Sequence, residues 1–252
     1  MREHAEMIAN LDPNVPVIAD MDTGYGGALP HSPTSLAPHL LIYVPGPIVV
    51  ARSTKQYIHS NVAGFHIEDQ VQSKRCGHLQ GKELVATDVY VSRIRAARAA
   101  RDKQRSDIVI IARTDALQKY GYDESIARLR AAQEAGADVG FLEGLTSKEE
   151  ARQAVRDLRP FPLLLNMVEH GATPTIGVDE AREMGFRVMI FPFAALAPAY
   201  TAIKGALERL KRDGLMGTGR ELTPRKLFEV CGLEESMRID AAAGGKAFEN
   251  GA

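Results

Sequence analysis

Three carboxylates lie at the ends of two short apolar runs, where strands of a sheet would end. Asp20 and Asp22 close the run VPVIADMD, and Glu68 lies at the end of AGFHIE. Alternate residues of a strand point to the same side, so the two aspartates are expected to face one site. Such oxygen ligands suit Mg2+ or Mn2+, which keep several bound waters. The pattern predicts a divalent-metal site at Asp20, Asp22 and Glu68; the alternative is that these acids are solvated or cap helices.

A cysteine lies in a positively charged loop soon after the second of these runs. The sequence KRCGH places Cys76 beside Lys74, Arg75, Gly77 and His78. Neighbouring cations favour a thiolate, so Cys76 is a candidate acid, base or nucleophile. Gly77 permits a sharp turn, and His78 can orient a substrate carboxylate or tune the thiol. The alternative is an exposed basic loop with an incidental cysteine.

Three more polar side chains end apolar runs: Arg113, Glu143 and Asn166. A strand-end arginine suits two-pronged binding of a carboxylate or phosphate. A buried strand-end glutamate can act as a base or pair with Arg113. For each of the three residues, a structural salt bridge or hydrogen bond is the competing interpretation.

These residues depend on an alternation of strands and helices. Apolar runs of strand type alternate with segments of helical periodicity, which predicts βα units on a parallel sheet. Side chains at the carboxyl ends of several strands meet in one mouth in a (β/α)8 barrel. A doubly wound sheet usually has a glycine-rich phosphate loop, and GYGG at 24–27 is not such a loop. We therefore expect an α/β fold, a TIM-type barrel with about six of the usual eight strands.

Two segments depart from this alternation. Residues 28–46 contain four prolines and no acidic residue, lysine or arginine. This segment is an active-site lid, a tolerated insertion, or an error of gene prediction such as a translated intron. We expect a partial barrel at 1–215 that includes it, and a C-terminal helical arm at 216–252 that contacts another subunit.

Composition limits the partners. The formal net charge of −1 and the lack of a long basic run argue against nucleic acid or an anionic membrane. No apolar stretch is long enough to span a bilayer, and the first residues lack the apolar centre of a secretory signal. Two cysteines without a CxxC motif suit a reducing compartment, so a cytoplasmic or mitochondrial location is expected.

Together these motifs resemble the isocitrate lyase/phosphoenolpyruvate mutase superfamily. The match runs in family order through ADMDTGYGG, FHIEDQVQSKRCGH, IIARTDA, FLEG and NMVEHGATP. The KRCGH loop is similar to that of the lyase branch, whereas phosphonomutases have a different loop without the cysteine. The resemblance implies a (β/α)8 barrel, Mg2+ held partly through water, and a homo-oligomer, a dimer or a tetramer. It also implies two further strands before residue 1, so the chain is expected to be N-terminally truncated.

The resemblance assigns a role to each matching position. Asp20, Asp22 and Glu68 correspond to the metal-site acids, and Cys76 corresponds to the catalytic acid/base, with Lys74, Gly77 and His78 in its loop. Arg113, Glu143 and Asn166 correspond to the substrate and charge-network positions. The implied reaction is retro-aldol cleavage of a 2-hydroxy dicarboxylate, which gives a 2-oxo acid and an enolate-like carboxylate that Cys76 protonates.

The implied substrates are 2,3-dimethylmalate and 2-methylisocitrate. The competing activity is hydrolysis of oxaloacetate to oxalate and acetate. Oxaloacetate hydrolases resemble one another in a serine after the GxT of the Asn166 segment, and Pro174 at this place favours a lyase. The same motifs also fit an inactive truncated member of the family, or a fragment that binds full-length relatives.

Overall fold

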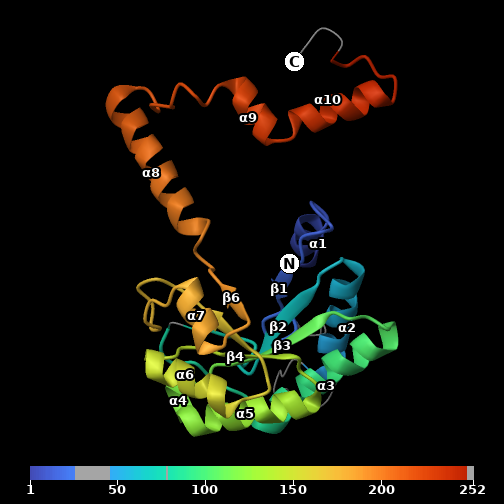
Figure 1. Cartoon of the computed structure of the whole chain (residues 1–252), viewed down its shortest axis with the longest axis vertical. Helices are drawn as coiled ribbons and strands as arrows, with labels where there is room; N and C mark the ends of the chain where they lie inside the picture. Colours follow the sequence, from blue (N-terminus) through green and yellow to red (C-terminus); the bar gives the residue numbers. More distant parts are fainter. Residues whose placement is uncertain (26–45, 78, 249–252) are drawn as a thin grey trace, which may run out of the picture. The chain divides into compact units, whose positions relative to one another are not determined.

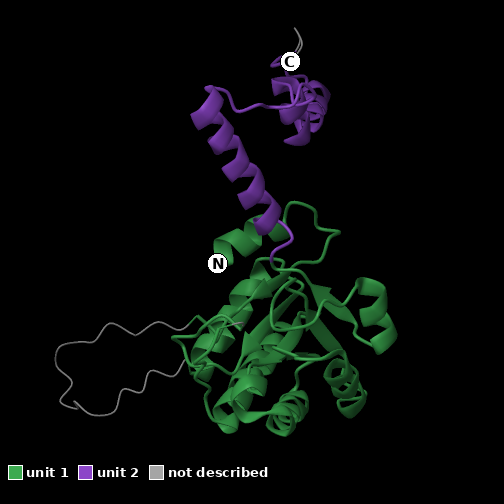
Figure 2. Cartoon of the chain, turned by 90° about the vertical axis from the view of Figure 1, so that its left-hand side faces the viewer, with its two compact units in different colours: residues 1–192 green, residues 193–252 purple. Residues whose placement is uncertain are grey.

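The computed structural model describes residues 1–25, 46–77 and 79–248. The segment 28–46 that was expected to interrupt the barrel therefore lies outside the described residues, apart from Gly46. The chain divides into two compact units, Met1–Pro192 and Phe193–Ala252 (Figure 2). The domain boundary expected after residue 215 stays a prediction.

The first unit is built on a parallel sheet of six strands in sequential order. The strands are β1 (Ile18–Asp20), β2 (Gly64–Glu68), β3 (Val109–Thr114), β4 (Val139–Leu142), β5 (Leu163–Asn166) and β6 (Val188–Ile190). Every neighbouring pair is parallel. The sheet curls into a half-barrel, with helices on its outer side (Figure 1). The predicted architecture, six of the eight strands of a TIM-type barrel, is confirmed.

Helices connect the strands, because parallel neighbours need a crossover connection. The first unit contains α1 (Arg2–Ala9), α2 (Pro47–His59), α3 (Thr87–Gln104), α4 (Leu117–Tyr120), α5 (Tyr122–Ala135), α6 (Lys148–Asp157) and α7 (Val178–Met184). The second unit contains α8 (Leu196–Asp213), α9 (Pro224–Val230) and α10 (Leu233–Ala242). No described helix is both long and apolar enough to cross a membrane.

Local sequence explains where these helices begin and end. Ser147 caps α6, because its hydroxyl oxygen accepts a hydrogen bond from the Glu150 amide at 3.0 Å. Glu150 in turn accepts from the amide of Thr146 at 2.7 Å. α5 ends at Gly136, whose φ of 109° lies in the left-handed region that glycine enters without strain.

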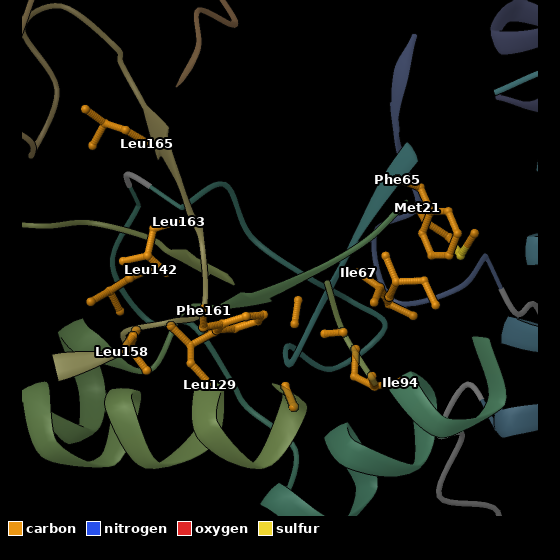
Figure 3. Close-up of a cluster of buried hydrophobic side chains, with 14 of the residues drawn as sticks. Met21, Phe65, Ile67, Ile94, Leu129, Leu142, Leu158, Phe161, Leu163 and Leu165 are labelled. Carbon is orange, nitrogen blue, oxygen red and sulfur yellow. The ribbon is translucent and has the colours of Figure 1, made fainter. Parts of the chain in front are cut away.

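Apolar side chains of the strands alternate between two sides of the sheet. On the outer side they pack against the helices; Figure 3 shows Phe65 and Ile67 of β2 with Ile94 of α3 and Leu129 of α5. Burying each such side chain contributes about 1.5–3 kcal/mol to folding. The inner side has a smaller apolar cluster: Ile111, Val139, Phe141 and Leu164. On this inner side, polar side chains occupy the ends of the strands beyond the apolar cluster.

Candidate active site

The register of the sheet brings the polar strand ends together. Asp20 is the partner of His66 across β1 and β2, and Glu68 is the partner of Arg113 across β2 and β3. Parallel strands end on the same edge of a sheet, which is the edge where TIM-barrel sites form. His66 and Arg113 also share the inner side with Phe141, at ring distances of 5.8 Å and 5.0 Å.

Asp22 reaches this edge in a way that strand alternation does not explain. β1 ends at Asp20, and Asp22 follows it with φ 48°, in the left-handed region. The Glu68 amide donates to the Asp22 carbonyl at 2.9 Å, and the Asp22 amide donates to Asp20 Oδ1 at 2.7 Å. We expected both aspartates to reach this edge because alternate residues of one strand point the same way. That reason is wrong for Asp22, which lies beyond the strand and reaches the edge through a turn.

A lysine from the cysteine loop lies between the two aspartates. Lys74 Nζ contacts Asp22 Oδ1 and is 3.8 Å from Asp20 Oδ2. Burial alone would lower the pKa of Lys74, but the hydrogen bond to Asp22 and the nearby carboxylates raise it. His66 Nδ1 is 3.5 Å from Asp20 Oδ1, and burial lowers the pKa of His66 although Asp20 opposes the shift. The two aspartates therefore already share one positive charge.

The side chain of Glu68 is fully buried, and its carboxylate lacks hydrogen bonds from the described residues. Neither of its carboxylate oxygens accepts a hydrogen bond from a described residue, and Arg113 is a neighbouring cation, with Nε 3.5 Å from Oε2. Burial raises the pKa of Glu68 to about 8, and the positive charge of Arg113 only partly opposes this. A buried carboxylate without donors suits a bound cation or its water.

These acids fit a hard divalent cation such as Mg2+ or Mn2+. Asp20 and Asp22 converge on one positive group, and Glu68 accepts no hydrogen bond from the residues that the structure describes. Over the described ranges, no three His, Cys, Asp or Glu side chains form a group that could hold a metal by themselves. Water between the ion and some of the carboxylates would complete such a site, as is usual for Mg2+.

Arg113 is the centre of a second charged group. It binds Asp115 through two hydrogen bonds, Nε to Oδ2 at 2.9 Å and Nη2 to Oδ1 at 3.1 Å. Its Nη2 is also 3.8 Å from Glu143 Oε2, which accepts from Asn166 Nδ2 at 3.1 Å. Burial would lower the pKa of Arg113, but Asp115, Glu143 and Glu68 raise it, so the guanidinium stays charged. Asn166 Oδ1 is buried and has no donor within the described structure.

The loop that carries Cys76 lies against this second group. A Cβ added at Gly77 would be 2.7 Å from Arg113 Nη2 and 2.7 Å from Glu143 Cγ, so only glycine allows this approach. Cys76 is a free, exposed cysteine. No hydrogen bond or ion pair within the described residues joins its thiol to the charged groups.

The structure thus brings together most of the side chains that the sequence singled out. Lys74, Gly77 and the strand-end residues Asp20, Asp22, Glu68, Arg113, Glu143 and Asn166 form one connected site. Pro174 lies half-buried in the loop after β5, beside the buried Thr173. His78 lies outside the described residues.

Sequence reasoning missed four residues that hold the site: His66, Gln70, Lys82 and Asp115. Asp115 had a readable signal, because it lies two residues after Arg113 in the run ARTDA. Lys82 and Gln70 had none, because their roles depend on contacts with the folded loop.

Comparisons with known proteins show the family of this chain. The model of the phosphoenolpyruvate phosphomutase family matches residues 43–211. A 2-methylisocitrate lyase of Aeropyrum pernix is 36% identical over 239 residues, which are 93% of this chain and 69% of that protein. A crystal structure of 2,3-dimethylmalate lyase is 62% identical with a TM-score of 0.90, over 100% of this chain and 77% of that chain.

A structure of oxaloacetate acetylhydrolase with the inhibitor 3,3-difluorooxalacetate is similar to nearly the same degree. It is 57% identical with a TM-score of 0.89, over 98% of this chain and 77% of that chain. The relatives thus include carbon–carbon lyases of the isocitrate lyase family. The chain belongs to the phosphoenolpyruvate mutase/isocitrate lyase superfamily, on its lyase branch.

Proposed function

We propose that this chain is a carbon–carbon lyase for a small 2-hydroxy acid, either a dicarboxylate of the 2,3-dimethylmalate type or the tricarboxylate 2-methylisocitrate. The observation that carries the proposal is the 62% identity with 2,3-dimethylmalate lyase over the whole chain. The site supports it, because buried carboxylates and a buried arginine lie at one edge of the sheet, against Gly77 of the loop that carries Cys76.

In this proposal, three carboxylates would bind the metal ion. Asp20, Asp22 and Glu68 would hold Mg2+ or Mn2+, in part through water. When bound, the ion would supply Lewis-acid stabilisation of negative charge on the substrate oxygens. Lys74 would remain the neighbouring counter-charge from the loop.

Arg113 and Asn166 account for substrate binding. Arg113 stays positively charged at the buried edge and attracts a carboxylate. Asn166 presents a buried Oδ1 that has no donor among the described residues, and a substrate hydroxyl or water can supply one. Pro174 would contact the substrate from the loop after β5.

The chain's own residues would move two protons. Removal of the substrate hydroxyl proton converts the C–O bond to a carbonyl, and the electron pair of the C–C bond passes to the leaving carbon. Glu143, on the inner edge, is the candidate base. Cys76 would donate its thiol proton to the leaving carbon, which completes the carboxylate product, and His78 would lie beside it in the loop.

A second activity has its own support. Oxaloacetate acetylhydrolase is 57% identical and shares the fold closely, so hydrolysis of oxaloacetate to oxalate and acetate is the competing proposal. Pro174 after the GAT motif, in place of the serine, favours the lyase.

One experiment separates the two activities. Purified protein with Mg2+ is assayed in parallel with 2,3-dimethylmalate, 2-methylisocitrate and oxaloacetate. Cleavage of either hydroxy acid yields pyruvate, whereas hydrolysis of oxaloacetate yields oxalate. Release of pyruvate that is lost in Cys76→Ser supports the lyase. Oxalate as the only product, or no product above the Cys76→Ser background, would overturn it.

A further inference from the structure

The loop that carries Cys76 is closed at its base by the main chain. Gln70 pairs with Leu84 in an antiparallel bridge. Next to it, the Val71 amide donates to the Glu83 carbonyl at 2.9 Å. These bonds fix the two ends of the loop and leave the stretch around Cys76 to be held by other contacts.

A side chain holds the peptide on the N-terminal side of the cysteine. Gln70 Oε1 accepts from the Arg75 amide at 3.0 Å, and Gln70 Nε2 donates to the Arg75 carbonyl at 3.0 Å. Both polar groups of Arg75's main chain are thereby fixed to the end of β2.

A buried lysine holds the peptide on the other side of the cysteine. Lys82 Nζ donates to the Gly77 carbonyl at 2.8 Å and to Asp115 Oδ1 at 3.1 Å. Its side chain is almost wholly enclosed, as is that of Asp115. Cys76 therefore lies between two anchored residues, Arg75 and Gly77.

The lysine anchor leads directly to the buried arginine. Asp115 Oδ1 accepts from both Lys82 and Arg113 Nη2, while Asp115 Oδ2 accepts from Arg113 Nε. Burial would raise the pKa of Asp115, but Arg113 and Lys82 outweigh it and lower that pKa. The carboxylate is therefore ionised and joins loop and strand through charged hydrogen bonds, which are the stronger kind.

Lys82 has a contact beyond its ion pair with Asp115. Arg113 already gives Asp115 two hydrogen bonds and a positive charge. Enclosing a second cation costs desolvation free energy. The additional contact that Lys82 makes is the one to the Gly77 carbonyl, next to the cysteine.

We propose that Lys82 is a positioning residue that fixes the peptide after Cys76 to the Asp115–Arg113 pair and so sets the place of the thiol over the site. The anchor itself is independent of the reaction; its effect on turnover rests on the proposed lyase function. Lys82 acts through Gly77 and Asp115, to which its ammonium group donates hydrogen bonds.

The test compares Lys82→Met, which has no donor, with Lys82→Arg, which keeps a charged donor. Lys103→Met is the matched control, because Lys103 is exposed on α3. Amide hydrogen exchange is measured without substrate in peptides that cover Gln70 to Leu84. Steady-state kinetics with the hydroxy acid that the wild type cleaves then give kcat and KM.

Lys82→Met should exchange about tenfold faster around Arg75 and Gly77, as loss of a charged hydrogen bond predicts. Its kcat should fall by about 100-fold, because a displaced catalytic group costs about that much. KM should change little, since Arg113 still binds Asp115. Lys82→Arg should recover part of the protection and of kcat, and Lys103→Met should match the wild type. Should Lys82→Met fail to fold, Lys82→Gln replaces it in the same comparison.

If amide hydrogen exchange around Arg75 and Gly77 is the same in folded Lys82→Met, or in Lys82→Gln where it replaces that variant, as in the wild type, Lys82 does not anchor the loop. A rise in KM with kcat retained would overturn the positioning of Cys76. If the wild type cleaves no hydroxy acid, the proposed function fails, and the exchange data still decide whether Lys82 anchors the loop.

Discussion

Arg113 lies opposite Glu68 in the register of β2 and β3, yet it gives its two hydrogen bonds to Asp115. Its Nε remains 3.5 Å from Glu68 Oε2. The guanidinium is thus oriented by one carboxylate and leaves the oxygens of another without a donor among the described residues. This arrangement makes Arg113 and Glu68 the clearest places to test the site.

Replacement of Arg113 by lysine should reduce activity although the charge is kept. An ammonium cannot reproduce the planar two-bond contact with Asp115. We expect kcat/KM to fall by about 100-fold, comparable to other losses of precise orientation. Steady-state kinetics measure this, with Arg152→Lys on the exposed side of α6 as the control. Activity within twofold of the wild type would contradict the role of the two-bond geometry.

A methyl group at Gly77 should disturb the site without unfolding the chain. The added Cβ would lie 2.7 Å from Arg113 Nη2 and 2.7 Å from Glu143 Cγ, so the loop must move away. Gly77→Ala is expected to lose about 100-fold in kcat while its thermal midpoint stays near that of the wild type. Gly177→Ala is a matched control, because a Cβ there meets nothing within 4 Å. Equal kcat in both variants would show that the close approach is unimportant.

Removal of the loop thiol should affect turnover far more than binding. Cys76→Ser keeps the size of the side chain but is a much weaker acid, and loss of a general acid typically costs about 10²–10⁴-fold in rate. Substrate affinity, measured by calorimetry, should be nearly unchanged. Cys231→Ser controls for loss of a free exposed cysteine elsewhere. A variant with full kcat would remove Cys76 from the mechanism.

Glu68 predicts a pH dependence of stability in the metal-free protein. Burial raises its pKa from 4.5 to about 8, so between these values the folded chain keeps a proton that the unfolded chain has released. Unfolding then releases a proton, and the free energy of unfolding falls as the pH rises through this window. Glu68→Gln has no such proton and should decline less between about pH 5 and about pH 8.

Chemical denaturation of both proteins in the presence of a chelator measures this difference. Added Mg2+ should stabilise the wild type more than Glu68→Gln at the upper pH, because a bound cation favours the ionised carboxylate. Parallel pH curves for the two proteins, with equal effects of Mg2+, would contradict the assignment of Glu68.

Sequence was sufficient for the parts of this molecule that depend on local pattern. Alternating strands and helices predicted the parallel sheet, and the polar residues that end apolar runs do lie at its carboxyl edge. Asp22 shows the limit of that reasoning. It reaches the edge through a left-handed turn and a hydrogen bond from the Glu68 amide, which no periodicity encodes.

The residues that hold the loop could not be predicted for a related reason. Lys82 and Asp115 are 33 positions apart and meet only after the loop folds onto β3. A lysine in a polar stretch such as GKEL is expected to be a solvated surface residue. Its burial follows from tertiary packing, which the linear pattern does not contain.

Asp115 Oδ1 accepts hydrogen bonds from both Lys82 and Arg113. This shared oxygen limits how substrate specificity can be redesigned. A substitution at Asp115 would remove the carboxylate that orients both cations, so attempts to admit a bulkier substrate there would damage turnover first. Thr173 and Pro174 lie on the separate loop after β5, whereas Arg113 lies on β3 and Asp115 directly follows that strand. Libraries aimed at a new side-chain preference are therefore better directed to that loop.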